Sequence, residues 1–509
     1  MSKGEEPICP HCGYPTRINE HAADCPSKKE GRVENTAETA LEKRNSFIHE
    51  APALLAGAGS FVPLPGSAHP DLIKPLFFER TDTTLPSDMA ERKVTAKVIP
   101  TMGRAAYLEQ ASTYHGEKYN FLQWKGVGEN PHTDIEGSAK EKSASVEFPL
   151  GKAGVSPLMF VSADGRNMLR FLGGSFYEDL LEEARNHERF FPYGLRMPEI
   201  VGTIKFSRAF CEQQGLPLPD SNDPEDVDGQ TLDAYLESHR DEIEPSLYAK
   251  LLTSGEAQSG YRSLILGQNI RAFRNVWRAE DLERIMDAPK DEKEKREAIS
   301  DVFATSRQIL GEELGRELDN PEYINEYARI LGEQTGILLA NRLDHGSLSD
   351  LKQNITLAGE VVDFDATKIV DNAYLQNEQH YPHGVFKDEV PQQDLVEEWR
   401  KGQKDELYRQ VYYMASHMKP LLDGLSLLHE ENMETENTVV EAFTRGLKKT
   451  ISIEMLTGLR TRLTSDPSFG TTENLYTGYD GSVDQLRQKN FQGCEQLFEQ
   501  VNSFLSNSL

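Results

Sequence analysis

Alternating apolar and polar residues mark the first half of the chain as rich in β-strands. The alternation is clearest between Lys93 and Lys125, in the segments VTAKVIP, RAAYLEQ and YNFLQWKG. This period of two is typical of strands that bury one face. Further strand signals follow in SASVEFPL and PLMFVSA, and the spacing from Phe176 to His187 predicts an amphipathic helix. Antiparallel strands with one helix indicate a small α+β lobe.

The second half has the apolar spacing of helices. Helical patterns cover 279–286, 290–315 and 321–340, and long ones run from Gln393 towards the end of the chain. The predicted fold class is therefore α+β with two lobes, a small β-rich lobe and a large, mainly helical one. The predicted divisions are a unit at 1–30, a linker and extended packing segment at 31–92, the small lobe at 93–275 and the helical lobe with C-terminal helices at 276–509.

The charge of the chain narrows the classes of partner. Its 509 residues include 83 acidic and 55 basic side chains, a net charge of −28 with histidine neutral. An acidic insertion at 218–245, which we expect to be a solvated surface loop, carries ten carboxylates and one arginine. Such a charge argues against binding nucleic acid or an anionic membrane. No stretch approaches the roughly 18 apolar residues of a membrane span, and the start lacks a signal-peptide core, so we expect a cytoplasmic protein.

Three of the five cysteines lie within the first 25 residues. Cys9 and Cys12 form a CPHC knuckle, and His21 and Cys25 follow, which gives the spacing C-x2-C-x8-H-x3-C. Zinc takes four such ligands in a tetrahedron, and a unit this small needs the metal to fold. The spacing predicts a CCHC zinc finger with a protein or ubiquitin-like partner. The alternative is a disordered tail whose cysteines have no role.

The most chemically informative segment runs from His345 to Asp365. It places Asp350 and Asn354 on one loop and Asp363 within the short β-type piece EVVDF. An asparagine and an aspartate held in this way supply hard oxygen ligands for the magnesium of a nucleotide, and Asp350 on the same loop can act on a hydroxyl. This is the order of a kinase catalytic loop and its metal-binding aspartate.

Upstream residues complete the pattern of a two-lobed nucleotide site. Lys125 lies in a predicted strand, in LQWKGVGENP, and Glu178 lies in the following helix, in SFYEDLLEEA. A strand lysine held by a helix glutamate positions phosphates in the small lobe of kinases. Lys125 and Glu178 mean little by themselves. In order with Asn354 and Asp363 they predict a protein-kinase-like fold.

The motifs LQWKGVGENP, ADGRNMLR, FYEDLLEEA and NIRAF and the HG…N…D stretch, taken together in this order, resemble the selenoprotein O family of kinase-like protein adenylyltransferases. The resemblance covers about half of the chain, from Gly103 to Asp365. It implies ATP and Mg²⁺ or Mn²⁺ as cofactors and the transfer of AMP to hydroxyl side chains of protein substrates. It also implies that the nucleotide binds in the opposite orientation to the one it has in kinases.

The resemblance implies roles for further residues. Gly103 and Arg104 match the second half of the family's phosphate loop, whereas Asp164 and Gly165 match a second turn that contacts the nucleotide. Arg271 of NIRAF matches one of two phosphate-binding arginines. The resemblance also implies that Lys125 binds phosphate, that Glu178 holds Lys125, and that Asn354 and Asp363 bind the metal.

Two departures from the family keep other functions open. The second arginine should lie seven residues before Arg271, where this chain has Leu264 with Arg262 nearby. The family's base should directly precede Asn354, where this chain has Gln353, and so we assign the base to Asp350. The alternatives are phosphoryl transfer or glutamylation on the same fold, or a catalytically inactive pseudokinase scaffold that the zinc finger recruits.

Overall fold

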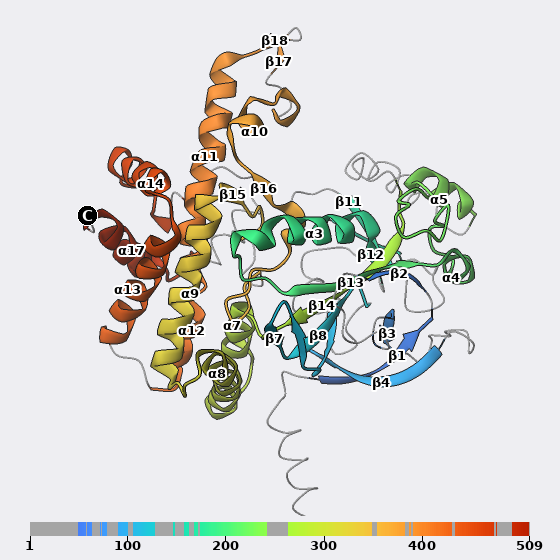
Figure 1. The fold of residues 1–509 in the computed structure, drawn as a ribbon, viewed down its shortest axis with the longest axis horizontal. Helices are drawn as coiled ribbons and strands as arrows, with labels where there is room; N and C mark the ends of the chain where they lie inside the picture. The colour runs from blue at the N-terminus through green and yellow to red at the C-terminus, as the bar shows by residue number, and fades with distance from the viewer. Residues whose placement is uncertain are drawn as a thin grey trace, which may run out of the picture.

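The computed structural model describes most of the chain from residue 49 onwards. The described residues are 49–57, 59–63, 72, 74–78, 90–99, 105–127, 146–147, 157–161, 167–171, 174–241, 263–348, 354–381, 386–387, 390–429, 433–472, 475 and 491–507. The predicted zinc finger at 1–30 lies outside them. Mixed α+β architecture is confirmed, with a sheet-rich half and a helical half seen side by side in Figure 1.

One antiparallel sheet organises the first half. It has nine strands, eight of them in the order β2-β13-β14-β8-β5-β4-β1-β3, with the short β12 pairing beside β14. The predicted alternation corresponds to β4 (Ala90–Val98), β5 (Ala105–Leu108) and β8 (Phe121–Lys125). Every residue is buried in the neighbouring strands β13 (Glu199–Phe206) and β14 (Leu266–Phe273). β12 comprises Ser175–Phe176.

The sheet also includes residues that the sequence pattern assigned to a linker. β1 (His49–Ala56) pairs with β3 (Leu76–Phe78) and with β4, and β2 (Gly59–Pro63) pairs with β13. We predicted a linker and an extended packing segment at 31–92, and these three strands are extended segments that pair within the main sheet. Leu55 and Leu76 are fully buried. Their contribution to the core explains why this segment joins the sheet.

Two insertions stand beside the main sheet. β9 (Val146–Glu147), β10 (Pro157–Val161) and β11 (Asn167–Phe171) form a separate three-stranded sheet, so these predicted strands exist but pair elsewhere. The acidic insertion is more ordered than the solvated loop we expected. Buried Lys205 donates to the carbonyl oxygens of Asp223 and Asp226, and α5 (Leu232–Ser238) follows, capped by Thr231.

Short hairpin strands β6 (Ser112–Tyr114) and β7 (Glu117–Tyr119) lie near the linker to the helical half.

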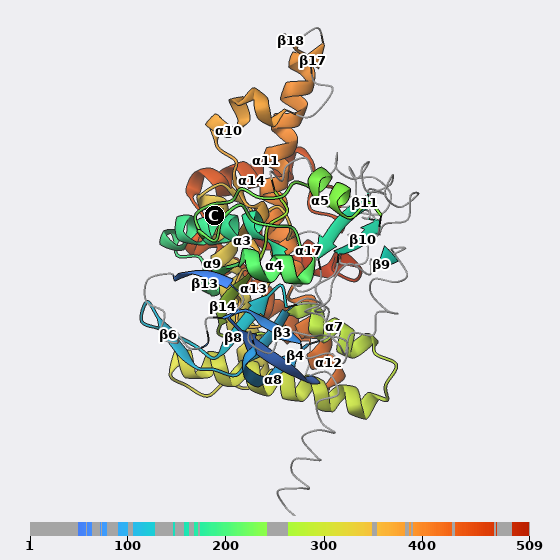
Figure 2. The same ribbon diagram turned by 90° about the vertical axis from the view of Figure 1, so that its right-hand side faces the viewer.

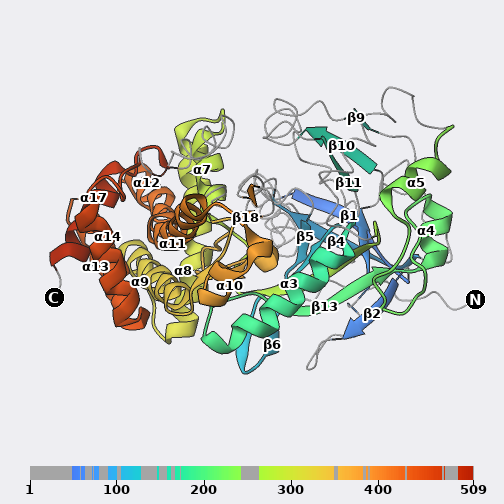
Figure 3. The ribbon, with the colours of Figure 1, turned by 90° about the horizontal axis from the view of Figure 1, so that it is seen from above.

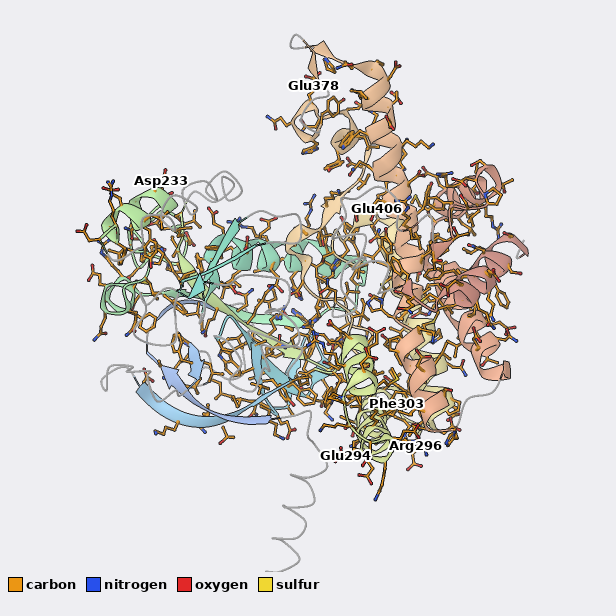
Figure 4. The ribbon with its side chains drawn as sticks, turned by 180° about the vertical axis from the view of Figure 1, so that it is seen from behind. Asp233, Glu294, Arg296, Phe303, Glu378 and Glu406 are labelled. Carbon is orange, nitrogen blue, oxygen red and sulfur yellow. The ribbon has the colours of Figure 1, made fainter. Side chains whose placement is uncertain are left out.

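The helical half begins at α7 (Ala279–Asp287), and its helices agree with the predicted ones. α8 (Glu292–Leu314), α9 (Asn320–Ala340) and α11 (Gln393–Ser416) are followed by α12 (Lys419–Leu427), α13 (Met433–Thr450), α14 (Ile453–Ser465) and α17 (Glu495–Asn507). α9 and α13 pack so closely that a Cβ at Gly332 would clash with the backbone of Phe443. Figure 4 shows Glu294 and Arg296 on the outer end of α8, whereas Phe303 is fully buried.

α3 (Tyr177–Phe190) lies across the sheet and reaches the helical half, as the view from above shows (Figure 3). One hydrophobic core includes Phe190 together with Tyr107 and Phe121 of the sheet and most of the buried helical residues. A second core lies within the sheet half, around Trp124 and Ile270. The shared core fixes α3 and the end of β8 relative to the helices, and this is where the predicted site residues lie.

The first part of α11 projects from the body as an arm, together with α10 (Asn372–Gln376), β17 (Phe386–Lys387) and β18 (Val390–Pro391) (Figure 2). Tyr374 and Tyr381 of this arm contact Trp399 of α11 through their rings. Among the helices of the described ranges, none combines the length and the apolar character that crossing a membrane would require.

Candidate nucleotide-binding site

Lys125 is the last residue of β8 and the first member of the site. Its Nζ lies 3.2 Å from Glu183 Oε2 and 2.9 Å from Asp363 Oδ1. The four preceding residues of β8 are buried, so the strand holds the lysine stem rigidly. Gly126 follows with φ +94°, and a Cβ there would press on the backbone of Gly174 and Ser175. The sequence therefore ends the strand with a residue that brings β8 close to the start of α3.

The carboxylate that holds Lys125 belongs to Glu183. Its side chain is 4% exposed and accepts hydrogen bonds from Lys125, from Arg271 Nη1 at 2.7 Å and from Asn269 Nδ2 at 3.2 Å. Burial opposes ionisation, but Lys125 and Arg271 outweigh it and hold the pKa of the Glu183 carboxyl below its usual value. Glu183 is therefore a charged, fully partnered residue in the interior.

The prediction that Glu178 holds Lys125 is corrected by this geometry. Both glutamates lie on α3, but five residues of a helix turn through about 500°, which places them on different faces. Glu183 lies on the buried face with Leu180 and His187, whereas Glu178 is half-buried in the first turn. The sequence segment LLEEARN contained the signal, since Glu183 follows Leu180 by three residues.

Arg271 lies on β14, beside β8, as the predicted site requires. It is 3% exposed, and its Nη1 donates to Glu183 Oε1 at 2.7 Å and to Asp363 Oδ1 at 2.9 Å. Its Nη2 donates to Gln123 Oε1 at 2.6 Å, and its buried Nε has no partner. Leu264, at the position of the missing family arginine, is 1% exposed in the core. Arg271 thus joins Lys125 at one cluster, and Leu264 contributes packing.

Asp363 is the point at which the helical half meets this cluster. Its Oδ1 accepts from both Lys125 and Arg271, and its side chain is 26% exposed. Burial disfavours its charge, but Lys125, Arg271 and Arg278 outweigh burial and hold the pKa of Asp363 well below its usual value. Its φ of +62° is rare for a residue with a side chain, and such backbone strain is often kept at functional sites.

His345 and Asn354 connect the loop to the segment that carries Asp363. The His345 ring is buried, and its Nε2 lies 2.8 Å from the Val362 carbonyl oxygen, to which it donates. Its Nδ1 accepts from Ser347 Oγ at 3.1 Å. Burial lowers the pKa of His345, which keeps this tautomer neutral. Val362 N donates to Asn354 O at 3.0 Å, so the backbone of Asn354 is tied to the residue that precedes Asp363.

Asn354 and Asp363 each keep one oxygen for a cation. Asn354 Nδ2 donates to the Ser347 carbonyl and hydroxyl oxygens, both at 3.0 Å. Asn354 Oδ1 and Asp363 Oδ2 accept no hydrogen bond from any residue of the described ranges. Magnesium commonly uses one or two protein oxygens and completes its shell with phosphate and water. The donor set therefore fits Mg²⁺, although the described residues include no group of three His, Cys, Asp or Glu side chains that could hold a metal ion.

Several predicted site residues lie outside the described residues, and their roles stay predictions. These are the phosphate-loop and turn residues Gly103, Arg104, Asp164 and Gly165, the base Asp350, and the zinc ligands Cys9, Cys12, His21 and Cys25. Gln353 and Arg262 lie outside them as well. The structure thus brings together Lys125, Arg271, Asn354 and Asp363.

His187 lies four residues after Glu183 on α3, and its pKa is lowered, which the sequence did not predict. Together with Glu183, Arg271 and Asp363 it lines a small cavity. Its Nε2 is buried without a partner, and Glu199 Oε2 lies 3.8 Å away. Burial is the main cause that lowers the pKa of His187 to about 4. Burial also raises the pKa of Glu199, and His115 opposes this.

We expect His187 to make the protein less stable in mild acid. The unfolded chain binds the histidine proton from about pH 6.5 downwards, whereas the folded protein does so only near pH 4. Stability therefore falls as the pH drops through this window, by up to about 3 kcal/mol, partly offset by protonation of Glu199. His187→Phe keeps a ring against Phe191 and should flatten the pH dependence of urea unfolding between pH 6.5 and 4. An unchanged slope would contradict the assignment.

Searches against models of protein families and against curated protein sequences returned no match to this chain.

Proposed function

We propose that this protein uses a kinase-like Mg-ATP site to transfer AMP from ATP to hydroxyl side chains of proteins. One observation carries the proposal. A lysine at the end of a sheet strand pairs with a glutamate of the helix packed on that sheet and with an aspartate, and the residue before that aspartate donates a backbone hydrogen bond to an asparagine. The choice of AMP rests on the resemblance to the selenoprotein O family.

The charges of the site support an anionic ligand. Lys125, Arg271 and Arg278 act on Asp363, and Glu183 is the other carboxylate in direct contact with this group. Lys125 and Arg271 face Glu183 and Asp363, two cations against two carboxylates, and Arg278 is a third cation that Asp281 and Glu280 also attract. A triphosphate bound with a divalent cation carries net negative charge, which cations at the site would attract.

The reaction requires few groups from the protein. An acceptor hydroxyl oxygen attacks the α-phosphorus, the bond from that phosphorus to the β-bridging oxygen breaks, and pyrophosphate leaves. The hydroxyl proton passes to a base, for which we propose Asp350. Lys125 and Arg271 would hold phosphate oxygens, while Glu183 keeps Lys125 in place. A magnesium ion on Asn354 and Asp363 would offset the charge that develops on the transferred group.

ATP labelled separately on the α- and γ-phosphates tests this proposal. After incubation of the purified protein with each ATP and Mg²⁺, alone and with cell lysate, we expect protein-bound label only from the α-position. Intact-mass analysis should show the mass of AMP on the modified protein. Label from the γ-position alone would instead indicate phosphoryl transfer, and glutamate incorporation would indicate glutamylation. Either outcome contradicts the proposal.

A second candidate is a scaffold that binds nucleotide without transferring any group. Gln353 at the family's base position and the buried Leu264 favour it. A zinc finger at Cys9, Cys12, His21 and Cys25 would then recruit the partner protein. Binding of ATP without label transfer from either phosphate would select this candidate.

A further inference from the structure

A continuous chain of side-chain hydrogen bonds runs from Asn354 to the residue that precedes Asp363. Asn354 Nδ2 lies 3.0 Å from Ser347 Oγ, which in turn lies 3.1 Å from His345 Nδ1. The other ring nitrogen, His345 Nε2, lies 2.8 Å from the Val362 carbonyl oxygen. The chain therefore connects the two segments that carry the predicted metal ligands, and the Ser347 hydroxyl stands in the middle of it.

The groups at the end of the chain determine the direction of every hydrogen bond. A carbonyl oxygen can only accept, so His345 Nε2 carries the hydrogen that Val362 receives. His345 is fully buried, and burial lowers its pKa, so the ring is neutral and Nδ1 keeps a lone pair. The Ser347 hydroxyl therefore donates to Nδ1, and its oxygen accepts from Asn354 Nδ2.

The same serine fixes which atom of Asn354 faces the site. Asn354 Nδ2 donates to Ser347 Oγ and to the Ser347 carbonyl oxygen, each at 3.0 Å. With Nδ2 held at Ser347, the planar amide places Oδ1 on the opposite side, where it is available to a cation. Asn354 is 2% exposed, so water competes little for these bonds. Loss of the hydroxyl would leave a single bond, about which the amide can tilt.

Val362 closes the chain into a ring. Its backbone N–H donates to the Asn354 carbonyl oxygen at 3.0 Å, and its own carbonyl oxygen accepts from His345. Asn354 and Val362 are thus connected twice, once directly through the backbone and once through Ser347 and His345. A buried network in which every member has its partner holds one arrangement, because movement at one bond strains the others.

The chain also supports the strained backbone of Asp363, whose φ is +62°. His345 binds the carbonyl oxygen of Val362 before it, and Asn186 Nδ2 donates to the carbonyl oxygen of Phe364 after it at 2.9 Å. The His345 and Phe364 rings meet edge to face, with their centroids 5.1 Å apart. Such a backbone conformation persists only where its surroundings determine it. The orientation of His345 therefore affects where the Asp363 carboxylate points.

We propose that Ser347 is a positioning residue of this site, whose hydroxyl orients Asn354 and His345 together and so sets the affinity of Asn354 and Asp363 for a divalent cation. The inference rests on the proposed function, because the cation is the one that this function requires. Ser347 acts through its neighbours, as residues that hold metal ligands commonly do. A hydroxyl can accept from the amide and donate to the imidazole at once, whereas alanine can do neither.

Ser347→Ala and Ser347→Thr test the role of the hydroxyl. The loss of the electron paramagnetic resonance signal of free Mn²⁺ measures cation binding to the full chain, and calorimetry measures ATP binding without metal. We expect Ser347→Ala to bind Mn²⁺ about 10-fold more weakly or worse, the usual effect of losing a residue that holds a metal ligand, with metal-free ATP binding unchanged. Ser347→Thr keeps the hydroxyl and should restore Mn²⁺ affinity. An equal loss in both variants would contradict the inference.

Ser306→Ala is the matched control. Ser306 is a buried serine of α8 whose Oγ also accepts from an asparagine amide, Asn275 Nδ2, at 2.8 Å. Its removal should lower the melting temperature and leave Mn²⁺ affinity at the wild-type value. If Ser347→Ala behaves in the same way, Ser347 is a structural residue and the inference is wrong.

The ¹⁵N resonances of the histidine rings give a readout that needs no metal. In the wild type we expect His345 to be protonated at Nε2 and hydrogen-bonded at Nδ1. Ser347→Ala should move the Nδ1 resonance towards that of a free ring nitrogen and leave Nε2 protonated, and His345→Gln assigns the signals by removing them. An Nδ1 resonance that does not move would show that Ser347 does not hold His345.

These measurements separate the failure of this inference from the failure of the proposed function. If the wild type binds Mn²⁺ and ATP and Ser347→Ala binds Mn²⁺ equally well, the inference fails and the proposed function stands. If the wild type binds both but transfers no group, AMP transfer is overturned, while a weaker Mn²⁺ affinity in Ser347→Ala still supports the positioning role. If the wild type binds neither, both are overturned.

Discussion

Asp363→Asn should reduce nucleotide-dependent transfer by at least about 100-fold, the loss expected when an enzyme loses one charged group that acts on a developing charge. Asp363 supplies an oxygen with no other hydrogen bond in the described structure and the negative charge that a divalent cation needs. Asparagine keeps the size and one oxygen but removes the charge. Transfer of label from ATP, measured at saturating Mg²⁺, gives the result.

The same substitution should also lower stability, because Asp363 accepts from two cations. Without its charge, Lys125 and Arg271 face each other with Glu183 alone between them, and we expect a loss of about 1–3 kcal/mol in urea unfolding. Asp371→Asn is the control, since Asp371 caps α10 on the projecting arm and asparagine caps helices equally well. Full activity in Asp363→Asn, with normal binding of Mg-ATP, would remove Asp363 from the site.

Local pattern predicted the secondary structure well, because periodicity of burial is a property of each segment. β4, β5, β8 and the helices α7, α8, α9 and α11 appear where alternation and helical spacing placed them. The pattern failed for β1 to β3, which pair with strands far along the chain. Pairing of that kind depends on tertiary contacts. The Gly- and Pro-rich sequence around these strands also lacks the alternating pattern by which a strand is recognised.

The site was predictable only to the level of residue type and order. Lys125, Arg271 and Asp363 are in contact, and Asn354 is tied to the same segment. The correct glutamate was not predictable, because α3 carries several carboxylates and the rotation of the helix decides which one faces β8.

Glu183→Gln should be the most destabilising single change at the site. The side chain is 4% exposed and accepts from Lys125, Arg271 and Asn269, so an amide would turn donor hydrogens towards these donors. It would also leave Arg271, 3% exposed, with Asp363 in place of two carboxylates as its counter-ion. Removing one partner of a buried ion pair costs about 3–5 kcal/mol. Urea unfolding at neutral pH should show a loss of this size.

Glu178→Gln makes the comparison direct, because it is the same chemical change on the same helix. Glu178 lies half-buried in the first turn of α3, where a carboxylate interacts with the helix dipole, so we expect a loss below about 1 kcal/mol. Lys125→Met should cost less when combined with Glu183→Gln than when made alone, because the two side chains share one interaction. Equal losses for the two glutamate variants, or an additive double mutant, would show that Glu183 does not hold Lys125.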